Sequence, residues 1–129
     1  MDIREISPLG MAFLGDGVFG LLVRERLVKL ANCSVDKLHK NSVKFVSASA
    51  QADIFKILMP HLTEKEHEIF KRGRNAHTSS VPKNSSVTEY RTATGVETLF
   101  GWLHLNGESE RIQELFELIW EVFSEKILF

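Results

Sequence analysis

Hydrophobic residues along this chain recur at the three- and four-residue spacing of amphipathic helices, and no segment alternates as a strand in a hairpin does. The clearest case is the segment from about Ser109 to Lys126, whose apolar residues share one helix face: Ile112, Leu115, Phe116, Ile119, Trp120 and Phe123. The hydrophobic pattern therefore predicts an all-α fold.

Serine residues mark the starts of the first predicted helices. Ser7, followed directly by a proline, predicts a helix that runs to about Ala31. Ser34 predicts a second helical stretch, which ends at about Met59 because a proline follows. The middle of this stretch, residues 46–52, is small and alanine-rich, so we expect a break or bend there.

Two more helices are predicted by the spacing Ser/Thr-x-x-Glu, which is typical of a capping box. It occurs at Thr63 and at Ser86 and predicts helices over residues 63–73 and 86–106. The first ends at Gly73, and Gly107 follows the second. Residues 74–85 are polar and include a proline, which predicts a loop. With no linker and no internal repeat, the whole chain, residues 1–129, is predicted to form one domain.

The first predicted helix contains an unusual number of glycines, at positions 10, 15, 17 and 20. Each costs roughly 1 kcal/mol relative to alanine inside a helix, unless close packing against another backbone compensates. The apolar residues of this helix also lie on all of its sides. We therefore expect it to be central and buried.

Charge is unevenly distributed, although the net charge is only −1. Between positions 71 and 91 there is a single acid, Glu89, and five basic residues: Lys71, Arg72, Arg74, Lys83 and Arg91. Between positions 108 and 125 six glutamates face a single base, Arg111. This asymmetry predicts one surface that faces a polyanion and another that faces water.

Two acids, Asp16 and Glu97, lie in otherwise apolar helices. Small residues flank both four positions away, Ala12 and Gly20 in one case and Ala93 and Gly101 in the other. If these two faces meet, the carboxylates converge, and a cation between them would relieve their repulsion. Oxygen ligands with room for water suit Mg²⁺, or Mn²⁺ as a substitute. Pairing of each acid with a nearby lysine or arginine explains the pattern equally well.

The basic segment combines cations, an amide and an imidazole after a predicted helix end, and continues onto the next helix. Such a set is typical of contacts to a phosphate backbone without base readout. Its candidate RNA-binding residues are Lys71, Arg72, Arg74, Asn75, His77, Lys83 and Arg91. A solvated loop with ordinary helix-end charges remains the alternative.

No apolar run is long enough to span a bilayer, and charged residues interrupt the start of the chain. With a single cysteine besides, we expect a cytoplasmic protein.

The segments Phe13–Phe19 and Val96–Gly101 resemble the two signature helices of the ribonuclease III catalytic domain. The runs Arg72–Ala76, Val81–Asn84 and Tyr90–Arg91 are similar to the Mini-ribonuclease III branch. The resemblance covers nearly the whole chain in order, without an appended double-stranded-RNA-binding domain.

This resemblance implies an all-helical bundle that dimerises with a second copy and hydrolyses double-stranded RNA with Mg²⁺. The implied substrate is precursor large-subunit (23S) ribosomal RNA. Because a chain without a separate binding domain contacts little of its substrate, we hypothesise that a ribosomal protein presents the RNA. Asp16 and Glu97 match the catalytic, metal-binding acids of the family.

The match is incomplete at three positions. Full-length ribonuclease III has further acids where this chain has Leu9, Ala12 and Thr94. The Mini branch departs similarly, so the resemblance still implies an active enzyme, while the number of metal ions stays open. A catalytically weak or inactive domain of the same fold, which dimerises and binds RNA without cutting it, is the alternative.

Overall fold

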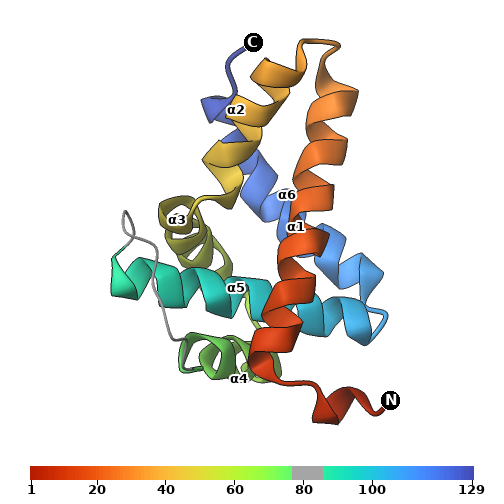
Figure 1. The fold of residues 1–129 in the computed structure, drawn as a ribbon, viewed down its shortest axis with the longest axis vertical. Helices are drawn as coiled ribbons and strands as arrows, with labels where there is room; N and C mark the ends of the chain where they lie inside the picture. The colour runs from red at the N-terminus through yellow and green to blue at the C-terminus, as the bar shows by residue number, and fades with distance from the viewer. Residues whose placement is uncertain (77–85) are drawn as a thin grey trace.

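A computed structural model describes residues 1–76 and 86–129, which form a bundle of helices (Figure 1). The α-helices are α1 (Pro8–Leu30), α2 (Val35–Val46), α3 (Ala48–Leu58), α4 (Glu64–Arg74), α5 (Val87–Leu105) and α6 (Ser109–Phe123). Short 3₁₀ turns cover Ile3–Glu5, Met59–His61 and Ser124–Lys126. The prediction of an all-α fold is confirmed. Within the described ranges, no helix is long and apolar enough to cross a membrane.

The predicted helix starts are found at the predicted capping residues. The side chains of Ser7, Ser34 and Ser86 each accept a hydrogen bond from a backbone N–H three residues later. Thr63 and Glu66 form a complete capping box. The expected break falls at Ser47, which ends α2 and caps α3 with its hydroxyl group. Local sequence therefore determines where these helices begin.

One predicted helix end is wrong. Helix α4 continues through Gly73 to Arg74, and Gly73 does not have a positive φ. A Cβ atom at Gly73 would overlap the side chain of Thr98 and lie 3.1 Å from the Cα of Gly95. Gly73 therefore allows α4 to approach α5 closely. The glycine that does follow a helix end is Gly107, whose φ is +69°.

Helix α5 is the central helix of the bundle, and α1, α3 and α4 pack around it (Figure 1). Aromatic rings from three helices meet in the core, where the centroid of Phe19 lies 5.4 Å from that of Phe100 and 5.9 Å from that of Phe116. All three side chains are at most 1% exposed. These contacts hold α1, α5 and α6 together.

The expectation that α1 is buried on all sides is wrong. Its inner face is buried through Phe19, Val23 and Leu27, but Phe13 is 85% exposed and Leu21 is 64% exposed. Within the residues that the structure describes, no other part of the chain covers these apolar side chains on the outer face. The apolar residues on all sides of α1 thus serve two surfaces, the buried inner face and an exposed apolar outer face.

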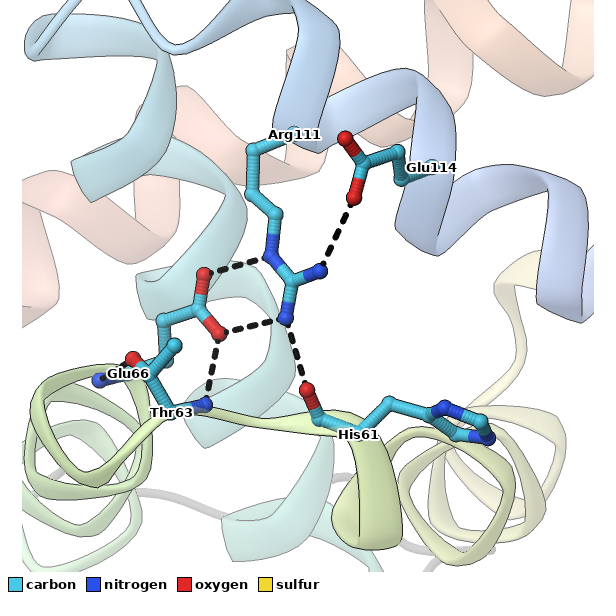
Figure 2. Close-up of polar contacts among 5 residues, drawn as sticks. All are labelled: His61, Thr63, Glu66, Arg111 and Glu114. Carbon is cyan, nitrogen blue, oxygen red and sulfur yellow. Dashed lines mark hydrogen bonds and ion pairs between the residues drawn. The ribbon is translucent and has the colours of Figure 1, made fainter.

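An ion-pair network ties the start of α6 to the start of α4 (Figure 2). Arg111 donates two hydrogen bonds of 2.8 Å to the carboxylate of Glu66, one of 2.7 Å to the carbonyl oxygen of His61 and one of 3.1 Å to Glu114. Burial alone would raise the pKa of Glu66, but the bonds from Arg111 and the Thr63 backbone N–H lower it. Glu66, which is 4% exposed, is therefore a buried, fully paired carboxylate.

Replacing Arg111 should destabilise the fold because Glu66 would remain buried without a partner. We expect Arg111→Met to lower the free energy of unfolding by about 3–5 kcal/mol. The double variant Glu66→Gln/Arg111→Met should recover part of this loss. Lys29→Met, which breaks an exposed pair with Glu25, is the control and should change stability by under about 1 kcal/mol. Urea unfolding measures all of these values, and equal effects of the two single substitutions would contradict the prediction.

Candidate active site

Helices α1 and α5 cross with their backbones in direct contact. A Cβ atom at Gly15 would overlap the backbone carbonyl of Glu97, and one at Gly101 would overlap the carbonyl of Met11 and lie 3.1 Å from the Gly15 nitrogen. Only glycine fits at either position without a backbone shift. By contrast, Gly20 lies under the Arg24 side chain of its own helix, away from the crossing.

This crossing brings the side chains of Asp16 and Glu97 together. Asp16 is exposed, and Glu97 is half-buried beside it. Burial of the Glu97 carboxyl group, its hydrogen bond with Asp16 and the negative charge of Asp16 raise the pKa of Glu97 to about 8. At neutral pH and without a cation, the pair therefore shares one proton, which Glu97 holds.

A buried threonine next to Glu97 fixes the position of α5 against α1. The hydroxyl group of Thr98 is a donor 2.7 Å from the carbonyl oxygen of Thr94 and 3.2 Å from that of Pro8, at the start of α1. Thr98 is 0% exposed. The sequence alone does not single out Thr98, because a threonine in an apolar helix gives no signal of its own.

The two carboxylates fit a hard divalent cation. Both present oxygen atoms, and a cation between them would replace the proton that burial and the neighbouring Asp16 retain on Glu97. In the described ranges no group of three or more His, Cys, Asp or Glu side chains could hold a metal. Ala12 and Thr94, two positions where the resemblance noted in the sequence implies acids in longer proteins, are buried at 6% and 7% exposure. A metal held by two carboxylates would keep several water ligands, as Mg²⁺ does.

Two of the candidate RNA-binding residues lie on different sides of one helix. Arg72 and Arg74 are separated by about 200° around α4. The Arg74 guanidinium lies 5.8 Å from the ring centroid of Phe70, and its Nε donates a 3.4 Å hydrogen bond to Asn75. Arg72 lines a pocket beside the N-terminal turn.

The remaining candidates differ in how far the structure describes them. Lys71 is exposed near the end of α4, and Arg91 is exposed in the first turns of α5. His77 and Lys83 lie outside the described residues.

Comparison with known proteins gives a consistent result. Residues 9–108 match the family model of the ribonuclease III domain. Mini-ribonuclease 3 of Thermoanaerobacter sp. is 43% identical over 123 residues, covering 95% of this chain and 87% of that protein. Mini-ribonuclease 3 of Clostridium tetani is 38% identical over 125 residues, covering 96% and 83%. A crystal structure of a Fusobacterium nucleatum protein matches with a TM-score of 0.84 at 30% identity, covering 92% of this chain and 97% of that one.

The chain therefore belongs to the ribonuclease III family of endoribonucleases, and within it to the Mini-ribonuclease 3 proteins. The resemblance seen in the sequence is confirmed. The family acts on double-stranded RNA and is generally metal-dependent.

Proposed function

We propose that this protein is a Mg²⁺-dependent endoribonuclease that hydrolyses double-stranded RNA, with Asp16 and Glu97 as its catalytic, metal-binding acids. One observation carries the proposal: two carboxylates from different helices adjoin at a backbone-to-backbone crossing, where burial of Glu97 and the nearby Asp16 raise the pKa of Glu97 to about 8. An uncompensated pair of this kind is typical of a site that binds a cation or a proton in function.

The two acids have different tasks because their surroundings differ. Asp16 is exposed and faces the side from which a phosphodiester can approach, while Glu97 is half-buried and must lose its proton before it can bind a cation. Mn²⁺ could substitute for Mg²⁺, and either ion supplies Lewis acidity toward the scissile phosphate and the attacking water. Loss of the 3′-oxygen would leave 5′-phosphate ends.

We propose that basic side chains hold the RNA backbone. Lys71, Arg72, Arg74, Asn75 and Arg91 offer charge and hydrogen bonds on exposed or half-buried positions, and His77 and Lys83 complete the set predicted from the sequence. Double-stranded RNA offers phosphates and 2′-hydroxyls on a regular A-form surface, so such contacts select for shape. Binding should therefore weaken steeply with salt.

We further propose a homodimer that forms through the outer face of α1. Phe13, Leu21 and Val28 are 85%, 64% and 62% exposed, and together with Gly17 and Arg24 they recur every three or four residues along one face of α1. A stripe of large apolar side chains in water is unfavourable, and a second copy would cover it. A two-fold dimer would then place two identical sites on opposite RNA strands.

Phe13→Asp should separate the dimer. Because Phe13 contributes little to the core of its own chain, the substitution should leave the monomer folded and raise the dimer dissociation constant by roughly 100-fold or more. Analytical ultracentrifugation measures this change. Val122→Asp, at a 48% exposed apolar position on α6, is the control and should remain dimeric. Equal effects of the two substitutions would refute the proposed face.

As the substrate we propose precursor 23S ribosomal RNA in the cytoplasm, with a ribosomal protein that presents the cleaved stem. A protein of 129 residues contacts a short length of RNA, and a presenting partner would supply the missing specificity. Equal rates of cleavage at the native sites in naked and protein-bound precursor RNA would argue against such a partner.

The function is tested with the purified protein and a labelled RNA duplex in Mg²⁺, in Mn²⁺ and in EDTA. We expect cleavage with either ion, no cleavage in EDTA and recovery when Mg²⁺ is added in excess. Duplex binding that persists in all three conditions without any cleavage would instead identify an RNA-binding domain that has lost its chemistry.

A further inference from the structure

A pocket of about 310 Å³ lies between the N-terminal turn, α4 and the C-terminal half of α5. Figure 1 shows the N-terminal segment on the side where α4 begins, below α5. The described residues that line the pocket are Ile3, Arg4, Ile6, Met11, Lys65, Ile69, Arg72, Trp102 and Asn106. Its volume is at the lower end of the range for sites that bind small ligands, which is about 300–1,000 Å³.

The charge of this pocket differs from that of its neighbour. Three of its described lining residues are cationic, Arg4, Lys65 and Arg72, and none is acidic. An adjacent pocket shares Trp102 as a wall but contains four glutamates and one arginine. Since the whole chain has a net charge of −1, the concentration of positive charge on one side of Trp102 is local. The first pocket therefore favours an anionic ligand.

Two of the three cationic side chains form ion pairs with exposed acidic side chains. Arg72 does not form such a pair among the described residues. Arg4 pairs with Asp2 at 2.8 Å, and Lys65 lies 4.0 Å from Glu68. Both pairs are exposed, so they cost little to break. Arg72 is exposed at the mouth of the pocket, and its planar guanidinium group can bind a phosphate through two hydrogen bonds.

The remaining polar groups suit a planar base. Trp102 is half-buried, and within the described residues its ring does not stack on another aromatic ring. Asn106 donates one hydrogen bond of 2.8 Å to the backbone oxygen of Trp102, and both residues line the pocket. The amide keeps a carbonyl oxygen and a second N–H for a base edge. Indole rings stack favourably on every base, and an amide selects among base edges.

We propose that this pocket binds one nucleoside monophosphate unit, with its phosphate at Arg72 and Lys65 and its base on Trp102. The unit is either a free mononucleotide or the unpaired terminal nucleotide of an RNA strand, since both offer the same phosphate, sugar and base. Arg72 thus acts in a bounded pocket, apart from Arg74 on the far side of α4.

This site is separate from the two acids. Met11 and Trp102 lie five residues from Asp16 and Glu97 on the same two helices, which is about 7.5 Å along each helix and about 140° around it. The pocket therefore opens on another side of the same crossing. Nucleotide binding here does not require the acids or a metal, so it stands independently of the proposed catalytic function.

Fluorescence of Trp102 tests the proposal directly. The chain has two tryptophans, and Trp120 stacks on Phe45 in the core, so the Trp120→Phe variant leaves Trp102 as the single reporter. AMP, GMP, CMP and UMP are titrated in EDTA, beside adenosine and inorganic phosphate. We expect the nucleotides to quench the fluorescence with saturation, and adenosine and phosphate to bind more weakly.

Arg72→Gln should weaken nucleotide binding by roughly tenfold or more, because it removes a charge-assisted contact from an exposed position that the fold does not need. Lys65→Gln should also weaken it. Lys56→Gln removes the same charge from α3, outside the lining of the pocket, and should leave binding unchanged. Absence of saturable quenching by AMP, or equal binding by Arg72→Gln and the parent, would overturn the proposal.

A second arm distinguishes the two sources of the nucleotide. RNA duplexes with and without a two-nucleotide 3′ overhang are compared in EDTA. Tighter binding of the overhang duplex, with displacement of AMP, identifies a strand end as the ligand. Saturable AMP binding without any effect of the overhang identifies a free mononucleotide. Both outcomes support the site and differ only in what brings the nucleotide to it.

Discussion

Asp16→Asn should reduce duplex cleavage by on the order of 10³-fold while leaving the fold intact. The substitution keeps the size of the side chain but removes one of the two carboxylates that adjoin at the crossing of α1 and α5. Because Asp16 is exposed, its loss does not open a cavity. Loss of one metal-binding acid typically costs several kcal/mol of transition-state stabilisation, and each 1.36 kcal/mol is about tenfold in rate.

The same experiment should give a matching result for Glu97→Gln. Glu97 has a pKa of about 8 and is mostly protonated at neutral pH without a cation, so glutamine closely imitates its resting form. We therefore expect unchanged thermal stability without metal and an equally large loss of cleavage. Asp53→Asn, an exposed acid on α3, is the control and should cleave at the parent rate. A folded and fully active Asp16→Asn protein would refute the assigned site.

Gly101→Ala should destabilise the fold by about 3 kcal/mol or more. The added methyl group would overlap the backbone carbonyl of Met11, so α1 and α5 must move apart. The overlap is with backbone and cannot be relieved by rotating a side chain. A lower midpoint in thermal unfolding, by roughly 10 °C, measures the effect.

The control is a glycine of α1 that has open space around it. Gly17 has no atom within 4 Å of an added Cβ, so Gly17→Ala should stabilise the helix by about 0.5–1 kcal/mol. Both substitutions are made in the Phe13→Asp background, which keeps contacts between copies along α1 out of the comparison. If Gly101→Ala melts at the same temperature as its parent, the backbone contact is not as close as described.

Much of the fold could be predicted because it depends on local chemistry. A capping serine or threonine satisfies backbone N–H groups within its own first turn, so Ser7, Ser34 and Thr63 identify helix starts without reference to the rest of the chain. The end of α4 could not be predicted in this way. Gly73 is glycine because Thr98, 25 positions later, packs against it, and nothing near Gly73 in the sequence reports that contact.

The same distinction applies to the site. Asp16 and Glu97 stood out because an acid in an apolar helix needs a partner. The position of closest approach did not stand out: the flanking pattern pointed to Gly20, whereas Gly15 makes the contact. Nor could the sequence distinguish Arg72 from Arg74. The two arginines lie on different sides of α4, and this can be recognised only when the helix is known to include both of them.

The backbone contact between α1 and α5 also determines under which conditions the two acids can separate. Active sites carried by surface loops often open locally, long before the protein as a whole unfolds. Here both acids are attached to helices that touch through Gly15 and Gly101, with Thr98 buried beside them. Amide protons at this crossing should exchange with solvent only when the entire bundle opens. The distance between the two carboxylates is then as durable as the fold, and heat inactivation and global unfolding become one event.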